Sequence, residues 1–199
     1  HFNAVGGLAD TTFFQLFFYG LWKVLPMIIV SYVVGLGIEF AVAQMKGHEI
    51  NEGFLVSGLL IPMIMPVEAP LWMVALSTAF AVIIGKEIFG GTGMNIWNPA
   101  LLARAFFFFS YPSMISGDKV WIAGDTADAI SQATPLAQMA LGQPLTYSTA
   151  DMFWGFIPGS VGETSAFCIL IGAVILLLTN VASWRTMISV FVGEIGRAS

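Results

Sequence analysis

Long apolar runs alternate with short polar breaks along this chain, and the lengths of the runs predict helices that cross a membrane. Val24–Met45 carries Glu39 as its only charge and reaches the roughly 20 residues that a membrane-spanning helix needs. Leu71–Ile84 is a second run that can extend to Gly90, and Thr164–Ala182 is a third. We therefore expect an all-α, polytopic membrane protein.

Two further apolar segments are too short to cross a membrane and are interrupted by proline or glycine. Phe54–Met65 runs into the proline-rich sequence IPMIMPVEAP, and Trp154–Gly162 reads WGFIPGSVG. Pro99–Ser110 predicts another helix that is too short to span. Broken segments that occur in pairs are typical of transporter cores built from inverted repeats. We therefore expect an inverted-repeat helical bundle with broken or re-entrant half-helices.

The sequence at the two ends of the chain indicates a fragment that is truncated at both its N-terminus and its C-terminus. The first residue is His1 rather than methionine, and the apolar run that starts at Met187 stops after about half a span. We expect residues 1–193 to form a single transmembrane domain that holds the first repeat and the start of the second. Residues 194–199, EIGRAS, are a candidate non-native tail.

Composition supports the membrane class and excludes several others. Charged residues make up 10% of the chain, against about 25% in soluble domains. The net charge of −5 argues against a nucleic-acid partner, which requires a basic face. A single cysteine and two histidines make an intrachain disulfide impossible and predict no metal site.

The distribution of charge predicts an orientation in the lipid bilayer. Lys46 and Arg185 mark cytoplasmic ends under the positive-inside rule. The segment 113–151 carries four aspartates against one lysine, so we expect it to form an outward-facing loop.

That loop contains the sequence DAISQAT, which has two interpretations. Ser131 or Thr134 can cap a short helix that begins with PLAQMAL, because Pro135 suits the first turn. Thr134 can instead accept a covalent group, since Asp128 lies six residues before it and Ala133 leaves room for a bulky partner. The spacing alone favours the helix cap.

A family resemblance changes that balance. DAISQAT matches a flavinylation motif. Four other segments match family motifs and occur in the family's order along the chain: KGHEINEGF, GGTGMNIWNPALLARAF, YPSMISGD and IPGSVGE. Over nearly all of residues 24–193 the chain resembles the NqrB/RnfD family, the membrane redox subunits of the sodium-translocating NADH:quinone oxidoreductases and of the Rnf complexes. HEINEGF favours the quinone-reductase branch. The resemblance implies a urea-transporter-like fold.

The same resemblance implies a function. Such a subunit of an NADH:quinone reductase carries FMN as a phosphoester on Thr134, holds non-covalent riboflavin, and passes electrons to ubiquinone while Na⁺ is exported. A flavin transferase would recognise Asp128, Ser131 and Ala133 around the acceptor. The expected partners are the other subunits of the complex, and the expected location is the bacterial cytoplasmic (inner) membrane, crossed several times.

The resemblance makes Glu39 and Gly35 candidates for the quinone site, where the family has a glycine pair followed closely by a glutamate. A carboxylate inside an apolar run is a functional candidate because its burial in a bilayer is unfavourable. Pairing with Arg104 or Lys86 for packing alone is the alternative, and the residues leave both open. The family has a second glycine directly after the first, where this chain has Leu36.

Asn95, Asn98 and Arg104 are the remaining candidates. The two amides can bind a flavin edge, as the resemblance implies for riboflavin, or cap the helix that starts at Pro99. Arg104 can neutralise a flavin or a carboxylate, or extend its charge to the membrane surface.

Two other functions stay open. One is an Rnf-type subunit of an ion-translocating ferredoxin:NAD oxidoreductase. The other is a cofactor-free transporter or channel with the same fold, because the broken segments alone predict no cofactor.

Overall fold

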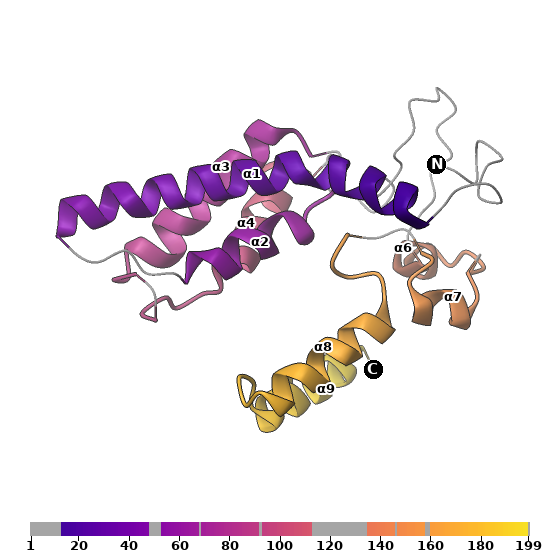
Figure 1. The fold of residues 1–199 in the computed structure, drawn as a ribbon. Helices are drawn as coiled ribbons and strands as arrows, with labels where there is room; N and C mark the ends of the chain where they lie inside the picture. The colour runs from indigo at the N-terminus through magenta and orange to yellow at the C-terminus, as the bar shows by residue number, and fades with distance from the viewer. Residues whose placement is uncertain are drawn as a thin grey trace.

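A computed structural model describes the chain at residues 13–47, 53–67, 69–91, 93–112, 135–145, 147–157 and 160–198. Over these ranges the regular structure is entirely helical, which confirms the predicted all-α class (Figure 1). The inverted repeat stays a prediction. The elements are α1 (Phe13–Lys46), α2 (Phe54–Met63), α3 (Leu71–Val82), η1 (Ile83–Glu87), α4 (Pro99–Ser110), α6 (Pro135–Ala140), α7 (Thr149–Trp154), α8 (Ala166–Leu178) and α9 (Trp184–Ala198).

Helix α1 is longer than its predicted span. It begins at Phe13 rather than Val24 and continues for 34 residues, so Pro26 lies in its interior rather than near its start. At 1.5 Å per residue it is about 50 Å long, which exceeds the roughly 30 Å of a bilayer core. Its segment Phe17–Lys46 is long and apolar enough to cross a membrane, and among the described helices it alone meets that length.

Helices α1 to α4 form one bundle, with α1 lying along the others (Figure 1). The C-terminal ends of α1 and η1 lie together, because Lys46 donates a hydrogen bond of 2.8 Å to the Glu87 carbonyl. Helices α3 and α4 run antiparallel, with Phe80 stacked on Phe106 at 4.3 Å between ring centroids. The core side chains are Met27, Phe54, Ile61, Met65, Ala69, Met73, Val74, Ala81, Val82, Ala100, Ala103 and Phe107.

The two ends of the bundle carry different parts of the chain. One end holds Lys46 and Glu87, and the start of α4 lies close to it, since a side chain at Gly85 would contact Leu102. At the other end the ring of Trp72 packs edge-on against Tyr111 at 5.5 Å. The predicted outward loop therefore leaves the bundle at the end opposite Lys46. Which end faces the cytoplasm stays a prediction.

Two short helices occupy the region that the sequence presents as a polar loop. α6 coincides with the predicted PLAQMAL helix, whereas α7 was not predicted. A capping box starts α7: the Ser148 hydroxyl accepts from the Asp151 N–H, and the Asp151 carboxylate accepts from the Ser148 N–H.

Helix α8 is shorter than the span predicted for Thr164–Ala182. It covers 13 residues and ends at Leu178. Asn180 follows with φ of 56°, and the N–H of Val181 donates to the Leu176 carbonyl at 3.1 Å. This is a Schellman-type termination with asparagine in the left-handed position. The apolar composition of the run did not reveal it.

The two broken segments meet at the end of α2. The N–H of Gly162 donates to the carbonyl of Met63 at 3.1 Å, and a Cβ on Gly162 would come within 3.2 Å of the Met63 Cβ. A side chain at this position would therefore be tight against Met63, and glycine allows the two backbones to approach without a shift. The turn that precedes α8 is thus fastened to the last residue of the α2 half-helix.

Candidate functional site

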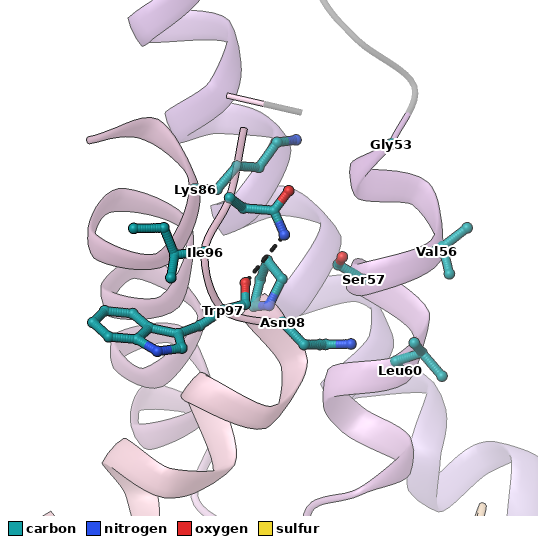
Figure 2. Close-up of a pocket in the computed structure, with 10 residues that line it drawn as sticks. Gly53, Val56, Ser57, Leu60, Lys86, Ile96, Trp97 and Asn98 are labelled. Atoms are coloured by element: carbon teal, nitrogen blue, oxygen red, sulfur yellow. Dashed lines mark hydrogen bonds between the residues drawn. The ribbon is translucent and has the colours of Figure 1, made fainter. Parts of the chain in front are cut away.

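A pocket of about 330 Å³ opens between the N-terminal halves of α2 and α4 and the end of η1 (Figure 2). Its lining combines a cation, amides and a hydroxyl with apolar side chains. The lining residues are Gly53, Val56, Ser57, Leu60, Lys86, Asn95, Ile96, Trp97, Asn98 and Pro99.

Asn98 holds the start of α4 beside this pocket. Its side-chain oxygen accepts from the N–H groups of Ala100 and Leu101 at 2.9 Å and 3.3 Å, and Pro99 occupies the first helical position. Asn98 is therefore the N-cap of α4, one of the two roles predicted for it. Figure 2 shows its side chain reaching from α4 towards α2.

Asn95 shapes the loop that closes the pocket. Its side-chain amide donates to the Trp97 carbonyl at 3.1 Å, and the Trp97 ring packs edge-on against Phe89 at 5.8 Å. The loop can turn this tightly because Gly91 and Gly93 have φ of 95° and 89°, a conformation that other residues rarely adopt.

Lys86 and Glu39 form a buried ion pair beside the pocket. The Lys86 ammonium donates to Glu39 Oε1, and the two side chains are 6% and 5% exposed. The ammonium also lies 6.0 Å from the centroid of the Phe54 ring. Of the two partners predicted for Glu39, the structure selects Lys86. An ion pair withdrawn this far from solvent is stable only while both charges are present.

Gly35 makes room for the Phe54 ring. A Cβ at Gly35 would overlap three carbons of that ring, so the glycine lets the first residue of α2 lie directly on α1. Gly37 comes one residue after the Leu36 that departs from the family pattern, and a Cβ there would meet no atom within 4 Å. Gly35 therefore contacts the ion pair indirectly, through the ring that lies under Lys86.

Arg104 lies away from this pocket, at the C-terminal end of α2. Its guanidinium donates to the Ile64 carbonyl and lies 3.3 Å from a Glu163 carboxylate oxygen. The Ile64 carbonyl belongs to the helix end, where backbone acceptors lack partners within the helix. Arg104 therefore satisfies the end of the half-helix and ties it to the turn before α8.

A second, apolar pocket of about 290 Å³ is also lined by Trp97 and Asn98. Its remaining lining residues are Leu101, Leu102 and Ala105 of α4. The polar and the apolar pocket thus share two side chains.

The flavinylation motif cannot be placed in this arrangement. Asp128, Ser131, Ala133 and Thr134 lie outside the described residues, as does either cap proposed for α6. The description resumes at Pro135, the first residue of α6.

The sequence predicted Lys86 only as an alternative partner of Glu39, and it did not predict Ser57 as a site residue. A signal for Lys86 was present, because a lysine within an apolar membrane segment is a functional candidate by default. No comparable signal marks Ser57, whose place in the pocket depends on tertiary packing.

Comparison with known proteins gives a consistent result. A family model described as the NQR2, RnfD, RnfE family matches residues 2–198. The chain is similar to the NqrB subunit of the Na(+)-translocating NADH-quinone reductase of Chromohalobacter salexigens, with 53% identity over 89% of this chain and 43% of that protein. It is 48% identical to the same subunit from Yersinia pestis, over 87% and 44% of the two chains. The corresponding Klebsiella pneumoniae (strain 342) subunit is 46% identical, over 96% and 48%. The chain spans less than half the length of these curated relatives.

Proposed function

The chain belongs to the NQR2, RnfD, RnfE family, and from this premise we propose that it is part of the NqrB subunit of a sodium-translocating NADH:quinone reductase. In this role it carries covalent FMN, holds riboflavin and passes electrons to ubiquinone, while Na⁺ is exported. It works with the other subunits in the bacterial cytoplasmic membrane. The names of the similar proteins support the quinone reductase over an Rnf-type subunit.

The observation that carries the proposal is the polar pocket at the starts of α2 and α4. A flavin presents carbonyl oxygens and an N–H along one edge of its ring system. The pocket offers the Lys86 ammonium, the Asn95 and Asn98 amides and the Ser57 hydroxyl, which can donate to or accept from such an edge. Its volume of about 330 Å³ lies at the lower end of the range for ligand pockets. The residues therefore fit the riboflavin that the family implies.

Thr134 is the proposed acceptor of FMN. A flavin transferase would use a flavin dinucleotide as donor: the Thr134 hydroxyl oxygen would bond to the flavin-side phosphorus and lose its proton, while the P–O bond to the other nucleotide breaks and a nucleoside monophosphate leaves. Asp128, Ser131 and Ala133 would form the motif around the acceptor. The next residue in the sequence, Pro135, is the first residue of α6. Bound flavins supply the electron-transfer chemistry, and this chain positions them.

Gly35 and Glu39 are the proposed contributors to the quinone site. Glu39 is held by Lys86 at the edge of the polar pocket, so a quinone bound near it would lie close to the riboflavin. Gly35 acts through the Phe54 ring that it accommodates.

Denaturing electrophoresis tests the covalent part of this proposal. The full-length subunit is co-expressed with a flavin transferase, and its band is inspected under ultraviolet light. We expect fluorescence in the wild type and in Thr149→Ala, an exposed threonine at the start of α7, but not in Thr134→Ala. A dark wild-type band, or a fluorescent Thr134→Ala band, overturns the assignment.

A second measurement tests the activity. The intact complex, reconstituted in vesicles, should reduce ubiquinone with NADH and accumulate Na⁺. A complex that accepts only ferredoxin as its redox partner would instead identify an Rnf-type enzyme. A flavin-free protein that still conducts ions would identify a transporter or channel.

A further inference from the structure

We propose that Lys86 is a ligand-binding residue of the polar pocket, whose ammonium donates to a carbonyl oxygen of the bound flavin while Glu39 serves as its buried counterion. The inference rests on the proposed function, because it takes riboflavin as the occupant of this pocket. Lys86 is the only cation among the residues that line the pocket. Through its bond to Glu39 it would also connect α1 to the ligand.

The position of Lys86 supports this role. Lys86 lies in η1, a five-residue π-helical segment that ends the helix begun by α3. Such turns are rare and occur often at functional sites. The turn brings a lysine that is 5% exposed to the wall of a pocket that also contains two amides.

The hydrogen-bonding capacity of Lys86 exceeds what Glu39 uses. An ammonium carries three N–H donors, and Glu39 Oε1 accepts one of them. The Phe54 ring faces the same cation at 6.0 Å, which stabilises its charge without accepting a proton. Lys86 can therefore keep its counterion and still donate to a ligand in the pocket.

A cation at this position would stabilise charge that develops on the flavin during reduction. The carbonyl oxygens of a flavin gain electron density when the ring system accepts electrons. A buried ammonium beside one of them stabilises that density far more than water would, because the surroundings screen charge poorly. Glu39 keeps the ammonium in place when the ligand is absent or neutral.

Two variants separate ligand binding from a purely structural ion pair. Lys86→Met removes the donor and leaves Glu39 buried without a partner, so this protein can fail to fold. The double variant Lys86→Met/Glu39→Gln removes both charges and avoids that problem. Glu39→Gln alone leaves the lysine without its charged partner, but it keeps the Lys86 donor, and the new amide oxygen can still accept from it. A ligand-binding lysine therefore predicts a larger loss of binding in the double variant than in Glu39→Gln.

The experiment titrates riboflavin into complex from which the non-covalent riboflavin has been removed, and follows the quenching of the added riboflavin's fluorescence. We expect the double variant to bind riboflavin about tenfold or more weakly, the loss typical of a hydrogen bond to a charged group. Glu39→Gln should bind more tightly than the double variant, because Lys86 remains available as a donor. Lys46→Met is the matched control, because Lys46 lies at the same end of the bundle, pairs with Glu87 and does not line the pocket.

Each outcome has a distinct meaning. If the wild type binds no riboflavin, the proposed function of the pocket fails. If the wild type binds and the double variant binds equally well, the assignment of Lys86 is overturned. Equal weakening in Glu39→Gln and the double variant also overturns it, because a purely structural pair would behave in that way. Covalent FMN fluorescence on denaturing gels should be the same in all variants, which confirms that each protein is produced and modified.

Discussion

Replacing Gly35 by alanine tests whether this glycine exists to accommodate the Phe54 ring. The new methyl group would occupy space that the ring now fills, and the ring is fully buried between Gly35 and Gly58. Over-packing of this kind costs about 1–3 kcal/mol. The helix itself gains up to about 1 kcal/mol when glycine becomes alanine. We therefore expect Gly35→Ala to destabilise the protein by about 1–2 kcal/mol.

Gly37→Ala is the matched control. It lies two residues away on α1, and a Cβ there meets no atom within 4 Å. Only the helical preference changes, so we expect a gain of about 0.5–1 kcal/mol. The free energy of unfolding can be measured for both variants by titrating denaturing detergent into mixed micelles.

A double variant identifies the clash. Leucine at position 54 removes the ring that the new methyl group would meet, so Gly35→Ala/Phe54→Leu should be less destabilised than the two single changes added together. We expect a coupling free energy of about 1 kcal/mol or more. Equal effects of Gly35→Ala and Gly37→Ala, or the absence of coupling to Phe54, would refute the reasoning.

Three further predictions follow from the contacts at helix ends. Asn98→Ala should destabilise the bundle by about 1 kcal/mol in the same titration, whereas Asn98→Asp should not, because aspartate also caps helices. Arg104→Met should cost about 1–3 kcal/mol because it removes the donor to the Ile64 carbonyl, while Glu163→Gln should cost under about 1 kcal/mol, since that pair is exposed. Ser148→Ala should accelerate hydrogen exchange in the amides of α7 by roughly the fivefold or more expected for a lost cap worth about 1 kcal/mol; unchanged exchange would contradict the capping box.

Elements with local start signals were predictable from sequence. Pro99–Ser110 matches α4 in both bounds. Asparagine followed by proline is a local signal for a helix start, and it does not depend on tertiary contacts. Phe54–Met65 matches α2 to within two residues at its end. The start of α1 was missed although Thr12, a residue type that caps helices, directly precedes Phe13 in the sequence, because Lys23 interrupts the apolar pattern.

Other elements were missed although their signals are present. The Ser148–Asp151 spacing is a capping box, but it lies in a stretch whose composition indicates a loop. The end of α8 depends on Asn180 adopting a left-handed conformation, and an apolar run that continues to Ala182 conceals it.

The site was only partly predictable, because its central contacts join distant residues. Glu39 had two possible cations, and the choice of Lys86 follows from how α1 lies against η1. The contact between Gly35 and Phe54 likewise depends on the packing of α2 on α1. Asn98 was predictable as a cap because its partners are its own neighbours in the chain.

The hydrogen bond from Gly162 to Met63 has a consequence for the order in which the chain folds. Helices α1 to α4 contact one another and are close in sequence. Their packing can therefore begin while the rest of the chain is still being synthesised. The end of α2 receives Arg104 as soon as α4 is made, but its bond to Gly162 must wait until the whole intervening segment has followed. We therefore expect the N-terminal bundle to form first, and the second half of the chain to join it later at the end of α2, beside Arg104.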